Sequence, residues 1–118
     1  MNLCDLNDLR DLLGRHGFRF SKSMGQNFLI DPAVPRDIAE ASGASPEWGV
    51  LEIGPGVGPL TVELARRAAK VVSVELDRSL LPVLAQTLAE YPHAEIVSGD
   101  IMKLDLNGLS GRNFRTGR

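Results

Sequence analysis

The chain has 118 residues, of which 43% are hydrophobic and 24% charged, with a formal net charge of −2. This composition is typical of one globular domain and excludes a polycation that would bind nucleic acid along its whole length. A single cysteine, Cys4, excludes an internal disulfide and a thiolate metal site. No apolar run approaches the roughly 20 residues of a membrane span, and the acidic start does not resemble a secretory signal, so a cytoplasmic protein without a membrane partner is expected.

In chain order, the first predicted element is an amphipathic helix over residues 3–13, where leucines recur at helical spacing and Gly14 is expected to end it. Residues 14–30 carry no clear period and are predicted to form an arm. Asp31 and Pro32 then mark the start of a second helix, with the acid as its cap and the proline in its first turn.

From residue 50 onward, short apolar runs alternate with segments whose apolar residues recur at helical spacing. Strands are predicted at residues 50–53, 71–74 and 95–98, and helices at about 60–68 and 80–90. Strands that alternate with helices over short links are typical of a parallel sheet covered by helices. After about residue 107 the apolar period is lost, and an irregular tail is expected over 107–118.

The link after the first strand, EIGPGVGPL, carries three glycines at alternate positions. Such a loop lies at the carboxyl end of its strand, where open parallel sheets bind ligands. Gly54 permits a sharp turn, and Gly56 has no Cβ to keep a ligand from the backbone. A dinucleotide fingerprint, G-x-G-x-x-G, fails because Pro59 occupies its sixth position. The preceding Glu52 and the spacing E-x-G-x-G-x-G favour the nucleoside half of S-adenosylmethionine instead.

Two acids follow at the ends of the next two predicted strands. Glu75 is placed to accept hydrogen bonds from both hydroxyls of a ribose. Asp100 ends the third strand in the sequence SGD and is placed to accept from an adenine amino group. Each feature alone would indicate only turn-forming glycines and acids that cap the surface. Sites at three consecutive strand ends together favour a nucleoside cofactor.

Four stretches extend this pattern: SKSMGQNFLID at residues 21–31, then EIGPGVGPLT, VELDRSL and GDIM. In order and spacing, from about residue 14 to about residue 105, the chain resembles the ribosomal RNA adenine N6,N6-dimethyltransferases, the KsgA-type family. The resemblance implies the amino-terminal half of a Rossmann-like class I S-adenosylmethionine-dependent methyltransferase fold, with strands in the order third, second, first. Residues 1–30 would be a helix and a basic arm, and residues 31–106 a partial cofactor-binding domain.

The resemblance also implies roles for single residues. The cofactor-binding residues expected from it, together with Gly56 from the loop argument, are Asn27, Leu29, Gly54, Gly56, Glu75 and Asp100. Asn27 and Leu29 would contact the methionine end of the cofactor from the arm. Arg15, Arg19 and Lys22 would meet phosphates of ribosomal RNA, although these side chains taken alone are equally typical of a solvated surface.

One part of the family pattern is missing from the sequence. The family places a catalytic Asn-Leu-Pro-Tyr motif on a fourth strand soon after the segment that matches GDIM, whereas this chain continues to Asn113, Phe114 and Arg115 without it. We therefore expect no catalytic residue, no fourth strand and no helical RNA-binding domain in these 118 residues. The chain is interpreted as an inactive cofactor-binding half of an enzyme that dimethylates adenine N6 in small-subunit ribosomal RNA. Residues 50–53 would be an exposed apolar edge that promotes self-association.

Three alternatives stay open. A nicotinamide-dependent dehydrogenase would use the same glycines and Glu75, but the arm motif and Pro59 disfavour it. A methylase of large-subunit ribosomal RNA that confers antibiotic resistance is a nearer alternative, although the Gly25–Leu29 sequence favours the small-subunit enzymes. The third is a non-catalytic protein that binds RNA or assists ribosome assembly.

Overall fold

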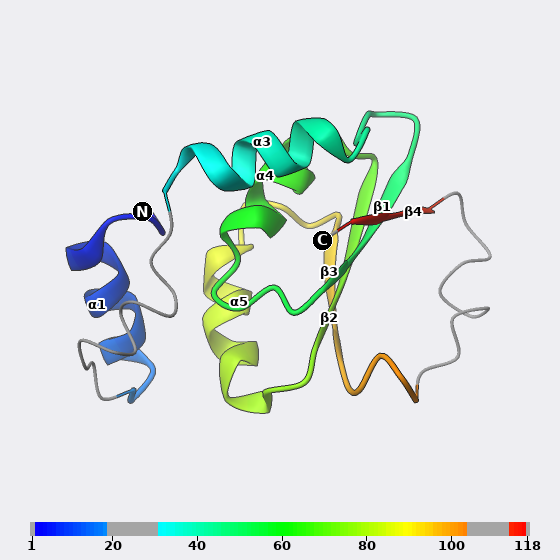
Figure 1. The fold of residues 1–118 in the computed structure, drawn as a ribbon. Coiled ribbons are helices and arrows are strands. Elements are labelled where there is room, and N and C mark those ends of the chain that lie inside the picture. Colours follow the sequence, from blue (N-terminus) through cyan, green and yellow to red (C-terminus); the bar gives the residue numbers. More distant parts are fainter. Residues whose placement is uncertain (1, 19–30, 104–113, 118) are drawn as a thin grey trace.

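The computed structural model describes residues 2–18, 31–103 and 114–117 (Figure 1). Its helices are α1 (Leu6–Arg15), α3 (Ala33–Ala41), α4 (Pro59–Arg67) and α5 (Leu81–Thr87), and a 3-10 turn, η1 (Arg78–Leu80), runs directly into α5. Its strands are β1 (Gly49–Ile53), β2 (Lys70–Glu75), β3 (Ala94–Ser98) and β4 (Phe114–Gly117). Within the described ranges, no helix combines the length and apolar character needed to cross a membrane.

The four strands form one parallel sheet in the order β3-β2-β1-β4. In the central pair, Val50 of β1 lies opposite Val71 of β2, and Glu52 lies opposite Ser73. The predicted order of the first three strands is confirmed. The valine-rich strand β2 is buried from Val71 to Glu75, as expected of an internal strand of a parallel sheet.

The fourth strand corrects the expectation of a wholly irregular tail. Phe114–Gly117 pairs in parallel with β1, with Gly49 opposite Phe114 and Glu52 opposite Gly117. Strand pairing needs only backbone N–H and C=O groups, and the free edge of β1 presents a row of them. A segment without an apolar period can therefore pair there. The exposed β1 edge, on which the expectation of self-association rested, is covered along Gly49–Glu52.

The first helix also differs from its predicted bounds. Gly14 lies inside α1, which continues to Arg15, and the chain leaves the helix through Gly17 with φ of 82°. At the other end, the Asp5 carboxylate accepts a hydrogen bond from the backbone N–H of Asp8 at 3.0 Å and caps the helix. Glycine is costly inside a helix but does not stop one when tertiary packing holds it.

The start of the second helix was predicted one residue too early. Asp31 accepts a hydrogen bond from the backbone N–H of Ala33 at 2.9 Å, but the N-cap of α3 is Pro32, which makes no side-chain cap bond. The predicted capping chemistry is present, displaced by one position. The helix ends at Ala41, and Gly43, with φ of 75°, turns the chain toward β1.

The helices pack on one side of the sheet, with α1 outside α5 and α3 beside α4 (Figure 1). Two apolar clusters fill this side. The first joins α1 to α5 and contains Leu9, Leu12, Leu13, Val83 and Leu84; the second joins α3 and α4 to the sheet and contains Ala39, Val50, Leu64, Ala65 and Val71. Burial of these side chains is the main force that holds α1 against the sheet domain.

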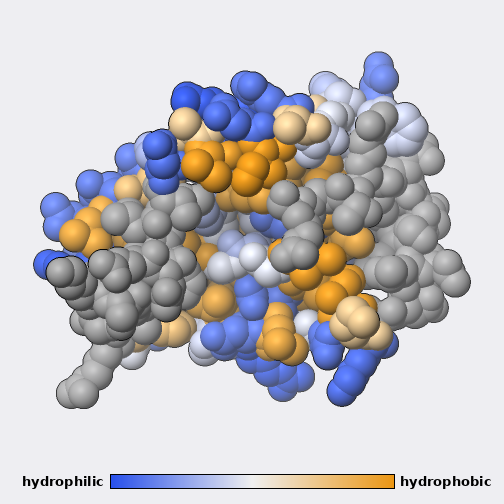
Figure 2. All heavy atoms as spheres, in the orientation of Figure 1, coloured by the Kyte–Doolittle hydropathy of each residue, from blue (hydrophilic) through white to orange (hydrophobic). Residues whose placement is uncertain are grey.

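The opposite face of the sheet is apolar as well. Residues alternate between the two faces along a strand, so Leu51 and Ile53 of β1 and Val72 and Val74 of β2 point away from the cluster that contains Val50 and Val71. Figure 2 shows hydrophobic atoms gathered over α3 and over the strands, between hydrophilic stretches of the surface.

Candidate functional site

The carboxyl ends of β1, β2 and β3 meet at one edge of the sheet, and a pocket of about 160 Å³ opens there. Its lining residues are Ile53, Gly54, Val74, Glu75, Leu76, Gly99, Asp100 and Ile101. The structure therefore brings together Gly54, Glu75 and Asp100, which the sequence placed at the ends of three successive strands. Open parallel sheets bind ligands at this edge.

Glu75 is the best-fixed polar group of this pocket. The residue is only 7% exposed, and both of its carboxylate oxygens accept backbone hydrogen bonds. The N–H of Gly56 donates to Oε1 at 3.1 Å, and the N–H of Asp77 donates to Oε2 at 2.9 Å. A carboxylate oxygen has room for more than one donor, so both oxygens can still accept from a ligand. Gly56 does not line the pocket and lies instead against this carboxylate.

The glycine loop is held in a conformation that other residues rarely adopt. Gly54 has φ of 72°, and its N–H donates to the carbonyl of Val74 at 2.9 Å, which ties the loop to β2. Gly58, the N-cap of α4, has φ of 103°, and a Cβ built there would lie 2.9 Å from Cγ2 of Thr87. Gly58 therefore serves close packing of α4 against α5, a role that the sequence pattern did not indicate.

Asp100 lies at the third strand end, half-buried at the pocket wall. Its Oδ1 accepts from the backbone N–H of Met102 at 2.9 Å, so the acid also caps the turn that follows β3. The N–H of Gly99 donates to the carbonyl of Glu75 at 3.0 Å and joins this turn to the end of β2. Capping and ligand binding use different oxygens or lone pairs, so the two interpretations of Asp100 are compatible.

A third acid, Glu52, is buried behind the pocket rather than in its lining. It is 2% exposed, and its Oε1 accepts from the hydroxyls of Thr61 at 2.5 Å and Ser73 at 2.7 Å. Burial raises the pKa of Glu52, the two hydroxyl donors act in the opposite direction, and the charge of Glu75 raises the pKa further. The sequence did carry a signal for this group, because VLEI and VVSV each hold one polar residue inside an apolar strand at positions that pair in the sheet.

The family model described as Ribosomal RNA adenine dimethylase matches residues 17–115. The chain belongs to this family. Among curated relatives of this chain, Ribosomal RNA small subunit methyltransferase A of Geobacillus thermodenitrificans is 50% identical over 105 residues, which cover 89% of this chain and 36% of that protein. The protein of the same name from Clostridium perfringens is 46% identical over 112 residues, covering 91% of this chain and 39% of the relative. The chain thus spans little more than a third of these relatives.

Solved structures resemble this chain in fold. The crystal structure of the 23S rRNA methyltransferase ErmE has a TM-score of 0.61 and 39% sequence identity, and the match covers 64% of this chain and 31% of that one. The N-terminal domain of EvdMO1, solved with S-adenosylhomocysteine bound, has a TM-score of 0.65 over 89% of this chain and 50% of that one, and at 21% identity it shows the fold alone. The predicted half of a class I methyltransferase fold is confirmed.

Part of the predicted site lies outside the described residues of the chain. Asn27 and Leu29, predicted to contact the cofactor, and Arg19 and Lys22, predicted to contact RNA, all fall in the segment 19–30. Arg15 is described and is exposed in the last turn of α1. Over the ranges that the structure describes, no group of three or more side chains is arranged to hold a metal ion.

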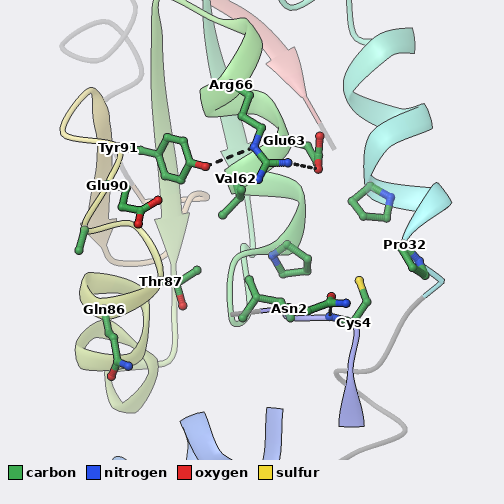
Figure 3. A pocket seen from close by; sticks show the side chains of 14 residues that line it. Asn2, Cys4, Pro32, Val62, Glu63, Arg66, Gln86, Thr87, Glu90 and Tyr91 are labelled. Atoms are coloured by element: carbon green, nitrogen blue, oxygen red, sulfur yellow. Dashed lines mark hydrogen bonds and ion pairs between the residues drawn. The ribbon is translucent and has the colours of Figure 1, made fainter. Parts of the chain in front are cut away.

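A larger cavity, of about 480 Å³, opens on the outer side of α4 and contains none of the predicted site residues (Figure 3). It lies among residues 2–4, the start of α3, the outer face of α4 and the end of α5. Arg66 crosses it, with Nε donating to the hydroxyl of Tyr91 at 3.2 Å and Nη1 donating to Glu63 at 2.9 Å. Glu63 also pairs with Arg67 at 2.7 Å, so its one carboxylate faces two guanidinium groups at the wall of this cavity.

Cys4 lines this larger cavity (Figure 3). Burial raises the pKa of its thiol, and the negative charges of Asp31 and Glu63 raise it further. A raised pKa keeps the sulfur protonated at neutral pH, and the thiol is a poor nucleophile compared with the thiolate. Cys4 is therefore not placed as a catalytic group.

Proposed function

We propose that this dimethylase chain forms the S-adenosylmethionine-binding part of an enzyme that dimethylates adenine N6 in small-subunit ribosomal RNA. The observation that carries the proposal is the pocket lined by Gly54, Glu75 and Asp100, at the ends of β1, β2 and β3. The names of the curated relatives support the choice of small-subunit ribosomal RNA as substrate.

The pocket offers a nucleoside the groups that it needs. The two oxygens of Glu75 would accept from the two ribose hydroxyls, and Asp100 would accept from the adenine amino group. Leu76, 71% exposed on the pocket lining, and Ile101 offer apolar surface to the faces of the base. A base seated there would bury an exposed leucine, which adds an apolar term to the polar contacts.

In the proposed reaction, the adenine N6 nitrogen attacks the methyl carbon of S-adenosylmethionine. The carbon–sulfur bond breaks, S-adenosylhomocysteine leaves, and N6 loses a proton; a second round gives the dimethylated base. The family's Asn-Leu-Pro-Tyr motif, which would hold the target adenine, does not occur in the 118-residue sequence. For this chain the proposal is therefore cofactor binding, with Gly54, Gly56, Glu75 and Asp100 as its described residues and Asn27 and Leu29 as further contacts from the arm.

A large-subunit substrate is the second candidate, and the likeness to the 23S rRNA methyltransferase ErmE favours it. The identities of 46–50% to small-subunit enzymes extend over more of this chain than the 39% identity to ErmE, which favours the first proposal. The two candidates share the cofactor and differ only in the RNA.

Calorimetric titration of the chain with S-adenosylhomocysteine and, separately, with NADH tests the cofactor proposal. We expect heat of binding with S-adenosylhomocysteine and none with NADH, because the glycine loop lacks the sixth-position glycine of a dinucleotide site. Tighter binding of NADH than of S-adenosylhomocysteine would contradict the proposal and favour the dehydrogenase alternative.

A further inference from the structure

Three buried polar side chains meet directly behind the glycine loop. Glu52 is 2% exposed, and Thr61 and Ser73 are fully buried. Both hydroxyls donate to the same carboxylate oxygen, Oε1 of Glu52. The three residues come from three different elements, since Glu52 lies on β1, Thr61 in the first turn of α4, and Ser73 on β2.

A carboxylate at this place is costly to the fold. The positions that precede these two residues on the same face of the sheet, Val50 and Val71, are apolar and belong to the core. Burial removes water from the carboxylate, and only two neutral hydroxyl donors replace it in the bonds that the structure gives. A nearby second acid, Glu75, makes the charged form still less favourable. An apolar residue at this position would cost less free energy to bury. The presence of the carboxylate therefore needs another explanation, which we find in the elements that its hydrogen bonds hold together.

The bonds fix the elements that build the pocket. Glu52 precedes Gly54 by two residues, and Ser73 precedes Glu75 by two residues on the paired strand. Thr61 follows Gly58 by three residues, so its hydroxyl fastens the first turn of α4, and with it the end of the glycine loop, to β1. Glu52 itself does not line the pocket.

We propose that Glu52 is a positioning residue of the nucleoside site, one that holds the glycine loop, the end of β2 and the first turn of α4 in register through Thr61 and Ser73. This inference rests on the proposed cofactor-binding function. Glu52 performs this role through its acceptor oxygen Oε1, because the hydroxyls of Thr61 and Ser73 both donate to that atom.

Four variants of the chain separate this role from a general loss of stability. Glu52→Gln keeps an acceptor oxygen for both hydroxyls, and Glu52→Ala removes it. Thr61→Val removes one donor with little change of shape. Thr87→Val is the matched control, because Thr87 is also a buried threonine but its hydroxyl donates to the carbonyl of Val83 within α5. The measurements are calorimetric affinity for S-adenosylhomocysteine and the hydrogen-exchange rate of the Gly56 amide, which is bonded to Glu75.

We expect Glu52→Ala and Thr61→Val to weaken binding by about tenfold or more, as for loss of a buried hydrogen bond, and to speed exchange at Gly56. Glu52→Gln retains most of the affinity, and Thr87→Val changes neither measurement even if it lowers the melting temperature. The proposal is overturned if Glu52→Gln is as weak as Glu52→Ala, because the charge would then act directly, or if Thr87→Val matches Thr61→Val. Absence of binding by the unmodified chain would refute the proposed function, whereas exchange at Gly56 would still test the network.

Discussion

The backbone amide of Gly56 donates a hydrogen bond to the carboxylate of Glu75 at 3.1 Å, and so the acid proposed to hold the ribose also holds the glycine loop. The second oxygen of the same carboxylate accepts from the amide of Asp77. One side chain thus joins the loop after β1 to the turn after β2. A change at Glu75 acts on the shape of the pocket as well as on a ligand contact.

Replacement of Glu75 by either Ala or Gln is therefore expected to weaken S-adenosylhomocysteine binding by roughly 2–3 kcal/mol. Gln fails because it offers one acceptor, whereas both oxygens of Glu75 accept from backbone N–H groups, and its amide group would face a donor. Calorimetry measures the affinities, with Glu47→Gln, a change at an exposed acid before β1, as the control. Unchanged affinity in Glu75→Ala would remove this acid from the site.

Two glycine substitutions are expected to change stability in opposite directions. Gly58→Ala should destabilise the fold by about 1–3 kcal/mol, because its φ is 103° and the new Cβ would lie 2.9 Å from Thr87. Gly14→Ala, inside α1 with open space around its Cβ, should stabilise the fold by about 0.5–1 kcal/mol. Urea denaturation of both variants gives the comparison, and equal effects at the two sites would contradict it.

The buried acid Glu52 predicts a specific pH dependence of stability. Its pKa is raised in the folded state, so the folded chain binds this proton more tightly than the unfolded chain does. The contribution of Glu52 to stability is then greatest below its unfolded pKa and is lost as the pH rises toward the folded pKa. Glu52→Gln does not titrate, so its stability relative to the parent chain should increase from acidic to neutral pH. Urea denaturation across that range measures the difference, and a constant difference would show that the folded pKa is not raised.

Cys4 is expected to react slowly with an alkylating reagent. Its thiol pKa is raised by burial and by two neighbouring acids, so less thiolate is present at a given pH than in a free thiol. The rate of reaction with iodoacetamide at pH 8 should be lower for the folded chain than for the same chain in urea. A faster reaction in the folded state would mean that the cavity activates the thiol.

The basic arm predicts a salt effect on RNA binding. If Arg15, Arg19 and Lys22 contact phosphates, replacing all three with Ala should weaken binding to ribosomal RNA and reduce its salt dependence by about two to three contacts. Affinity for S-adenosylhomocysteine should change little. The matched control is a triple change of Arg36, Arg78 and Lys103, which are exposed elsewhere on the surface. An identical salt slope in the arm variant would assign these side chains to the solvated surface.

Much of the sheet could be predicted from the sequence because its strands are short apolar runs bounded by glycines and polar residues. The local sequence is enough to predict the strand at Val71 to Val74 and the loop at Gly54. The helices that alternate with the strands predict that the strands run parallel. The strand at Phe114–Gly117 could not be predicted in this way, because its pairing depends on the free edge of a distant strand. The Glu52 network could not be predicted for a similar reason. Its two donors, Thr61 and Ser73, lie 9 and 21 residues from Glu52 in the sequence and reach its carboxylate only in the folded chain.

The order in which the strands pair has a consequence for how the chain folds. Register partners are 21 residues apart between β1 and β2 and 23 between β2 and β3, but Gly49 and Phe114, paired between β1 and β4, are 65 residues apart. The longer loop costs about 1 kcal/mol more entropy to close, and contacts between distant residues form later in folding. A ribosome synthesising this chain would thus release a three-stranded unit with its helices already able to assemble. The fourth strand then pairs with a sheet edge that has already formed. Until it does, the backbone N–H and C=O groups at the edge of β1 can pair with any other extended segment nearby.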